Sequence, residues 1–137
     1  MDFFEKMREY RNTHNLYAIK EGIVVEELRE GYAKVVKTLQ PDDMNPAGIA
    51  HGGIYFTLAD VAAGAAAASH GYHTVTLNAN YNYFRSVKAG VTITAEAHEI
   101  KSGKTVRVFD VHVTDQDGAL LGTGTFTCYV LDRKIEL

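Results

Sequence analysis

The feature that most constrains this chain is an alanine-rich segment, Gly52 to about His70, that carries a single charged side chain, Asp60. Alanine is the best helix former, so the segment predicts one long helix, with Gly71 as a plausible stop. The helix is apolar nearly all round, which predicts burial on most sides. A buried carboxylate is unfavourable unless it is paired, and the helix contains no Lys or Arg. Asp60 therefore either reaches solvent or a distant cation, or has a functional role.

Two strands and a loop are predicted ahead of this helix. The segments Ile23–Arg29 and Tyr32–Leu39 are rich in β-formers, and Glu30-Gly31 gives a hairpin turn between them. Residues 40–50 contain both prolines of the chain, which is typical of a loop. Before the hairpin, apolar residues at helical spacing between Asp2 and about Asn12 predict a short amphipathic helix that caps the body of the protein.

After the helix the hydrophobic period changes to two. From Thr74 on, polar and apolar residues alternate, which predicts a half-buried strand with Thr76 and Asn78 on its polar face. Three more strands, separated by polar turns, are predicted at Val91–Ile100, Lys104–Thr114 and Ala119–Leu131. Two strands, one long helix and four antiparallel strands make an α+β protein rather than a βαβ alternation.

Length and composition limit the classes of function. A chain of 137 residues with 46% apolar and 23% charged residues is the size of one globular domain. A net charge of −3 gives no basic footprint for nucleic acid, and no apolar window is long enough to span a membrane. The one cysteine, Cys128, cannot form an internal disulfide, which favours a reducing compartment. We expect a soluble, cytoplasmic single domain over residues 1–137, with residues 1–14 as a helical cap.

The start of the long helix suggests where chemistry takes place. His51-Gly52-Gly53 stands where a helix presents unpaired N–H groups and the positive end of its dipole, and glycines let a ligand approach the backbone. Such a site suits an oxyanion or a polarised carbonyl oxygen. Two glycines also fit an ordinary loop-to-helix turn. Together with the lone Asp60, however, they are typical of a carbonyl activator and a base or nucleophile.

The spacing of Gly52 and Asp60 adds a constraint. They are eight residues apart, or about 12 Å along one helix. One carbonyl group cannot contact both, because catalytic contacts need roughly 3 Å each. Two such helices packed antiparallel would bring Gly52 of one subunit near Asp60 of the other, with the small alanines and Gly64 permitting close approach. The sequence therefore predicts a two-fold dimer with two shared sites.

The segment from Asn45 to Asp60 resembles the motif of hotdog-fold acyl-CoA thioesterases, most closely the phenylacetate-degradation thioesterase subfamily. The motif residues are Asn45, Gly48, His51, Gly52, Gly53 and Asp60. The likeness extends from about Gly22 to Leu131. It implies a hotdog fold, a sheet wrapped around one central helix, which matches the element order above. It also implies hydrolysis of an acyl-CoA to the free acid and coenzyme A, without a cofactor, by a homodimer at least and a homotetramer as the fuller assembly.

The resemblance implies roles for the motif residues. Asp60 would be the general base that activates water, or the nucleophile that forms an acyl-enzyme anhydride. Gly52, together with Gly53, would supply N–H donors to the thioester carbonyl oxygen. Asn45 would orient the water or the thioester. His51 matches the motif histidine, with a role in catalysis or in holding the loop.

Further substrate-binding residues follow from the same resemblance. Thr76 falls where related enzymes place a Ser or Thr near the water, and Tyr83 belongs to an aromatic set that suits an aryl or an aliphatic acyl pocket. Arg85 is a candidate for binding the acidic part of the coenzyme. The turn that resembles the coenzyme A-contacting segment of the family, and that also fits an ordinary hairpin tip, consists of Lys101, Ser102, Gly103, Lys104 and Thr105.

Two other functions stay open: a non-catalytic acyl-CoA-binding regulatory module, and a hotdog hydratase or dehydratase. The N-terminal helix is too short for a helix-turn-helix, so a regulatory module would need a partner chain. Dehydratases of this fold use a His and acidic pair, whereas a lone helical Asp60 after His-Gly-Gly favours hydrolysis. The pair His70 and His73 lacks the further ligands of a metal site, and we expect none. The acyl group is not fixed by the sequence.

Overall fold

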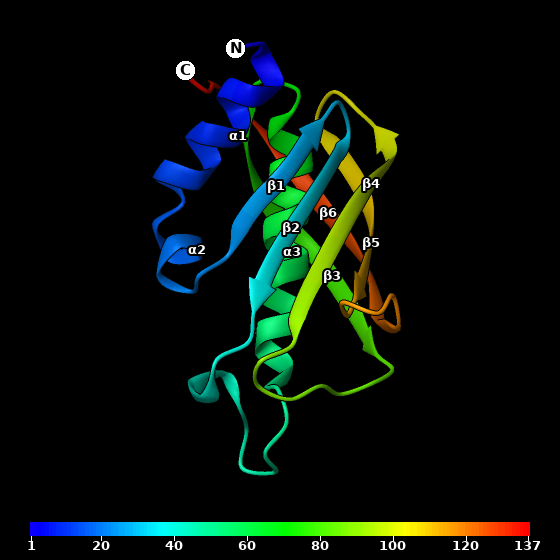
Figure 1. Cartoon of the computed structure of the whole chain (residues 1–137). Coiled ribbons are helices and arrows are strands. Elements are labelled where there is room, and N and C mark those ends of the chain that lie inside the picture. The colour runs from blue at the N-terminus through cyan, green and yellow to red at the C-terminus, as the bar shows by residue number, and fades with distance from the viewer.

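One antiparallel sheet wraps around one long helix (Figure 1). The computed structural model describes all of residues 1–137, and the six strands lie in the order β1-β2-β4-β5-β6-β3. The elements are α1 (Phe3–His14), α2 (Leu16–Lys20), β1 (Val24–Arg29), β2 (Tyr32–Thr38), the 3₁₀ turn η1 (Pro41–Asp43), α3 (Gly52–Ala68), β3 (Tyr72–Tyr83), β4 (Thr92–Ser102), β5 (Val106–Thr114) and β6 (Leu120–Lys134). The predicted α+β architecture is confirmed. None of the helices is both long and apolar enough to cross a bilayer.

The N-terminal region contains two short helices where one was predicted. Asn15 ends α1, and its side chain caps α2 by accepting a hydrogen bond from the N–H of Ala18. The side chain of Asn12 makes two 2.9 Å hydrogen bonds with the backbone of Val25 in β1. Because β1 is an edge strand, these bonds satisfy backbone groups that no other strand pairs. The N-terminal cap is thereby fixed to the sheet.

The long helix α3 has a wide buried face and a narrow open stripe. Most of its residues, including all of its alanines, are buried against the concave face of the sheet. The residues that are not fully buried recur at helical spacing and form what we call the open stripe: Gly52, Gly53, Phe56, Thr57, Asp60 and Gly64. The helix ends at Ala68, and Gly71 takes the left-handed conformation, with φ of 89°.

The alanines of α3 do not act as we expected from the sequence. They pack inside their own chain, so they offer no small-residue surface to the helix of a second subunit. The open side of Gly64 is also occupied, because Nη2 of Arg11 lies 3.1 Å from the point where a Cβ on Gly64 would be. Any contact of α3 with a second chain would therefore be made by the rest of the open stripe.

The first half of β3 also differs from the prediction. The hydroxyl of Thr76 faces α3, whereas Val75 and Leu77 are 49% and 62% exposed. The cause is a register shift in the pairing with β6 between Thr76 and Asn78. One extra residue in a strand reverses the faces of the residues on one side of it. After the shift the alternation matches the prediction, and Ala79 packs against the core.

Candidate functional site

Asp60 lies in the middle of the open stripe and accepts a 2.6 Å hydrogen bond from Oγ1 of Thr76. Its side chain forms no ion pair within the chain. A cavity of about 530 Å³ opens beside it, lined by Arg11, Asn15, Tyr17, Phe56, Thr57, Asp60, Val61, Gly64, Thr74, Val75 and Thr76. The arrangement presents a half-buried carboxylate, oriented by one hydroxyl, to a cavity with aromatic walls. A carboxylate so placed can accept a proton or attack an electrophile.

At the start of α3, His51 serves as a helix cap. Its Nδ1 accepts a 2.9 Å hydrogen bond from the N–H of Gly53. The accepting nitrogen carries no proton in this arrangement, so a neutral ring holds its proton on Nε2. The bond also occupies the Gly53 donor, which the sequence had assigned to the substrate. Gly52, the first residue of the helix, has no acceptor within the helix for its N–H. Of the two predicted donors, only the N–H of Gly52 is therefore left without an acceptor within the chain.

Tyr83 covers the start of the helix from β3. Its hydroxyl donates a 2.9 Å hydrogen bond to the carbonyl oxygen of Gly52, and its ring lies 3.4 Å from the position of a Cβ on that glycine. The ring also packs edge-on against Tyr55 and Tyr81. Burial raises the pKa of both Tyr55 and Tyr81, so both phenols are neutral near pH 7. The cluster fixes the end of β3 against the helix N-terminus.

Asn45 organises the loop that precedes the helix. Its Oδ1 accepts hydrogen bonds from the N–H groups of Ala47 (2.9 Å) and Ile49 (3.3 Å). Its backbone is bonded to Ile49 and Gly48, and Gly48 takes the left-handed conformation at φ of 79°. The side-chain oxygen is therefore used within the loop, and the amide Nδ2 is the group of Asn45 that is left for a ligand or water.

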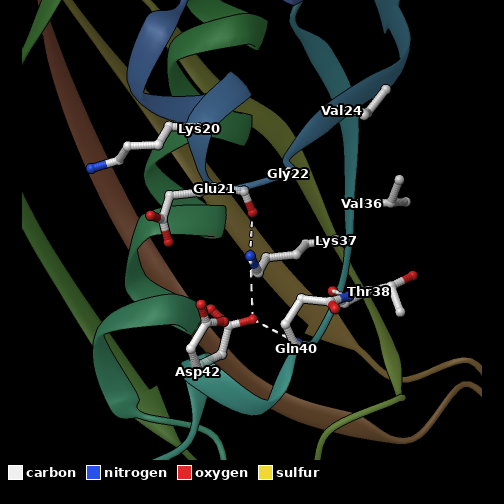
Figure 2. Close-up of a pocket in the computed structure, with 10 residues that line it drawn as sticks. Lys20, Glu21, Gly22, Val24, Val36, Lys37, Thr38, Gln40 and Asp42 are labelled. Atoms are coloured by element: carbon white, nitrogen blue, oxygen red, sulfur yellow. Dashed lines mark hydrogen bonds and ion pairs between the residues drawn. The ribbon is translucent and has the colours of Figure 1, made fainter.

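A buried ion pair ties this loop to the rest of the chain (Figure 2). Nζ of Lys37 lies 3.2 Å from the Asp43 carboxylate, and the two side chains are only 5% and 9% exposed. Lys37 also donates to the carbonyl oxygen of Glu21. The carbonyl oxygen of Asp43 in turn accepts a 2.9 Å hydrogen bond from the N–H of His51. A continuous set of contacts thus runs from α2 through β2 to the residue that caps α3.

The polar cavity shown in Figure 2 is lined in part by this ion pair. It measures about 520 Å³ between α2, β2 and the 3₁₀ turn, and the side chains that line it include Lys20, Glu21, Gln40 and Asp42. None of the predicted site residues borders it. Its lining is almost wholly polar, and we assign it no part in the site.

The predicted coenzyme-binding residues lie apart from Asp60. Lys101 and Ser102 end β4, and Gly103, Lys104 and Thr105 form the turn into β5. Lys104 and Thr105 border a separate cavity of about 470 Å³ with Arg107, whose Nε donates to the carbonyl oxygen of Gly103. Arg85 is exposed in the segment after β3. The structure therefore brings Asp60 together with Thr76, and Gly52 with His51, Gly53 and Tyr83. It does not bring the turn or Arg85 to either group within one chain.

Sequence analysis missed three residues that the structure places around the site: Arg11, Lys37 and Asp43. Two of them carried a signal. The side chain of Lys37 points to the buried side of β2, because the next residues on that side, Val35 and Leu39, are buried. Arg11 continues the inward side of α1 four residues after the buried Met7. A charged residue at a position where the pattern predicts a buried apolar side chain indicates a buried partner. The sequence does not identify that partner, because it comes from a distant segment of the chain.

Other titratable residues have structural partners. His70 lies in the turn after α3, where its Nε2 is 2.8 Å from the Glu99 carboxylate. Cys128 is fully buried, and burial, with the nearby charge of Asp60, raises its pKa to about 11. No three His, Cys, Asp or Glu side chains gather closely enough to hold a metal ion.

Comparison with known proteins shows the class to which this fold and site belong. The profile of the thioesterase superfamily matches residues 47–121, more than half of the chain. The Escherichia coli protein named acyl-coenzyme A thioesterase PaaI is 32% identical over 114 residues, which cover 80% of this chain and 81% of that protein. The chain therefore belongs to the thioesterase superfamily, and within it to the PaaI-like hotdog thioesterases.

Solved structures agree with this assignment. The structure of E. coli PaaI superposes with a TM-score of 0.88 at 27% identity, covering 98% of this chain and all of that one. A Streptococcus pneumoniae thioesterase protein solved with coenzyme A has a TM-score of 0.83 at 31% identity, covering 88% and 96% of the two chains. Mutant structures of that protein carry alanine for an aspartate and, separately, for a threonine at the same sequence spacing as Asp60 and Thr76.

Proposed function

We propose that this thioesterase hydrolyses an acyl-CoA to the free acid and coenzyme A, with Asp60 as its base or nucleophile. The observation that carries the proposal is the Asp60 carboxylate, bonded to Thr76 and open to a cavity on the exposed stripe of a helix that is otherwise buried. The aspartate and threonine replaced in the pneumococcal relative, at the same spacing, support the choice of this pair. That relative binds coenzyme A, which supports the same ligand for this chain.

As a general base, Asp60 would take a proton from water as the water oxygen attacks the thioester carbon. The tetrahedral intermediate would then collapse, the C–S bond would break, and the coenzyme A thiolate would leave and take up a proton. As a nucleophile, Asp60 would itself attack the carbon and expel the thiolate, and water would hydrolyse the resulting anhydride. Rapid quenching of a single turnover, followed by the mass of the intact protein, separates the two. Only the second route adds the mass of the acyl group.

The N–H of Gly52 is the donor we assign to the thioester carbonyl oxygen. It lies at the positive end of the α3 dipole and is held by the Tyr83 contact and by the His51 cap on the next residue. Asn45 would orient the water or the thioester through its remaining amide group. Lys101, Lys104 and Arg85 would contact the phosphates of coenzyme A as exposed cations.

We further propose that each site is shared between two chains of a homodimer, with a homotetramer as the larger assembly. Gly52 and Asp60 lie about 12 Å apart along α3, too far to hold one carbonyl group. Strand β3 forms one edge of the sheet over 12 residues and exposes the apolar side chains of Val75 and Leu77. Such an edge is normally covered in a soluble protein, and pairing with a second copy covers it. Gly52 of the partner subunit would then complete the site around Asp60.

Mixing two inactive variants tests the shared site. Gly52→Pro removes the N–H donor but fits the first position of a helix, where proline is favoured, and His51 before it already has the extended backbone that proline requires. Asp60→Asn removes the base. In a shared site, a mixed dimer of the two variants has one site with both native groups, so random reassortment restores about a quarter of wild-type activity. A site within one chain recovers nothing on mixing.

The activity itself is tested by thiol release from a panel of aryl, short and long acyl-CoAs. We expect turnover of at least one member and release of stoichiometric free thiol. Purified protein that retains an acyl-CoA without cleaving it would instead indicate a regulatory module. We expect neither a metal nor a redox cofactor to be needed, and dialysis against a chelator should leave the rate unchanged.

A further inference from the structure

Arg11 is a charged side chain in the candidate cavity that the proposed chemistry leaves unused. It comes from α1, and its guanidinium lies over Gly64, where the absence of a side chain makes room for it. Gly64 follows Asp60 by about one helical turn on the same face of α3, which is about 6 Å along the helix. The guanidinium and the Asp60 carboxylate therefore open on the same cavity, about one helical turn apart.

The guanidinium has no partner within the chain. Nε of Arg11 is buried and makes no hydrogen bond, and no ion pair of the chain includes this residue. Burial lowers the pKa of Arg11, an effect that the charge of Asp60 partly opposes. An arginine nevertheless keeps its proton in proteins. A charged group with a buried, unpaired donor is unfavourable for folding, and the folded state is stabilised when a ligand supplies an acceptor.

The cavity favours one kind of ligand group at this point. Arg11 and Asp60 are the only charged residues that line it. Asp60 is engaged by Thr76 and is not in salt-bridge contact with Arg11, so the guanidinium keeps its donors. Their planar fork matches the paired oxygens of a carboxylate or a phosphate, and at about one helical turn from Asp60 it is within reach of a carboxylate on the acyl group itself. Phe56 and Tyr17 also line the cavity, and their aromatic rings suit methylene groups.

We propose that Arg11 determines specificity by binding a carboxylate at the far end of the acyl group. The preferred substrates would then be short monothioesters of dicarboxylic acids with coenzyme A. This rests on the proposed function, because it places the thioester carbon at Asp60. Asp60 and Gly64, over which the guanidinium lies, are ~6 Å apart along α3, and an acyl chain of about four to six carbons matches that separation.

Matched substrates test this assignment. Succinyl-, glutaryl- and adipyl-CoA are compared with butyryl-, pentanoyl- and hexanoyl-CoA, which have the same lengths and no carboxylate. For the wild-type protein we expect kcat/KM to favour the best dicarboxylic member over its neutral match by about 10- to 100-fold, the size of a charge-assisted hydrogen-bond pair. In Arg11→Met this preference should disappear, while hydrolysis of the neutral acyl-CoAs stays within about threefold of wild type.

A second variant provides the matched control. Arg8→Met removes the same charge from the same helix at a residue that does not line the cavity. It should retain the full preference for a terminal carboxylate. Arg11→Lys keeps the charge but loses the fork, and should retain only part of the preference.

Binding measured in a variant that lacks the proposed base tests the preference for a carboxylate independently of hydrolysis. In Asp60→Asn, calorimetry should show tighter binding of glutaryl-CoA than of pentanoyl-CoA, and Arg11→Met in that background should abolish the difference. If neutral acyl-CoAs are hydrolysed but neither rate nor binding prefers a carboxylate, the role of Arg11 is overturned and the thioesterase assignment stands. An equal loss with both substrate series in Arg11→Met also overturns it, because that marks a structural role. If no acyl-CoA is hydrolysed or bound, the proposed function itself fails.

Discussion

The two faces of α3 differ in composition and in the role that we assign to each. The buried face consists of alanines and larger apolar residues that fill the space under the sheet, and its one polar group is the Tyr55 hydroxyl, which accepts a hydrogen bond from the N–H of Val87. The open stripe has glycine wherever another group comes close: Tyr83 at Gly52 and Arg11 at Gly64. Between them stands Asp60. Substitutions on the buried face should thus change stability, whereas substitutions on the stripe should change activity.

The largest loss of stability is expected from breaking the Lys37–Asp43 ion pair, which supports the N-terminal end of the open stripe. Lys37→Met leaves the Asp43 carboxylate buried without its cation, which costs about 3–5 kcal/mol for a pair of this kind. We expect this loss in the free energy of unfolding from urea titration, together with a fall in kcat/KM as the Asp43–His51 contact loosens. In the double variant Lys37→Met/Asp43→Asn much of the loss should be recovered. Additive losses in the double-mutant cycle would show that the two side chains do not interact.

On the buried face, Ala63→Leu tests tight packing. Ala63 is wholly buried, and adding three carbons to a filled core costs about 1–3 kcal/mol. The free energy of unfolding should fall by that amount, while kcat/KM of the folded fraction stays close to wild type. Phe56→Leu on the stripe is the control and should show the reverse pattern. Equal stability losses at the two positions would contradict the division of the helix into two faces.

Thr76→Val tests whether the hydrogen bond from Thr76 positions the Asp60 carboxylate on the open stripe. The substitution keeps the shape of the side chain but removes the hydroxyl that donates to Asp60. We expect a fall in kcat of about tenfold, equivalent to roughly 1.4 kcal/mol of transition-state stabilisation, with little change in thermal stability. The control is Asn78→Ala, on the same strand beyond the register shift. A normal kcat in Thr76→Val would mean that this hydrogen bond does not orient the carboxylate.

Gly64→Ala should have the smallest effect. A Cβ there would lie 3.1 Å from Nη2 of Arg11, but that atom is the far end of a flexible side chain. The gain in helix propensity of about 1 kcal/mol should nearly balance the displacement of the guanidinium. We therefore expect a change of less than ~1 kcal/mol in unfolding free energy. A loss of several kcal/mol in thermal or urea denaturation would show that Arg11 cannot move.

The sequence predicted the helix and strands well where local pattern determines structure. The alanine-rich segment and its stop at Gly71 depend on propensity and backbone conformation, and the two hairpin-joined strands before it depend on a local turn. The strand after the helix was predicted in the wrong phase over its first half. A register shift with β6 causes this, and pairing with a strand about fifty residues later leaves no mark in the local alternation.

The candidate site, like the fold, combines residues that the local sequence suggested with contacts that only the folded chain determines. His51, Gly52 and Asp60 belong to one short segment of the sequence, so both their spacing and the resemblance made them candidates. The cap of His51 on Gly53, which removes one predicted donor, depends on a side-chain rotamer that no pattern specifies. The contact of Arg11 with the cavity depends on how α1 docks on the sheet, which only the assembled fold determines.

The central claim is that Asp60 on the open stripe performs the hydrolysis. The most direct test is kcat/KM for thiol release by Asp60→Asn, measured on the best acyl-CoA of the panel alongside its thermal unfolding and its size in solution. We predict a fall of about 10³-fold, the scale of a lost catalytic base, with the assembly and the melting temperature of the wild-type protein retained. Wild-type turnover by this variant would contradict the account.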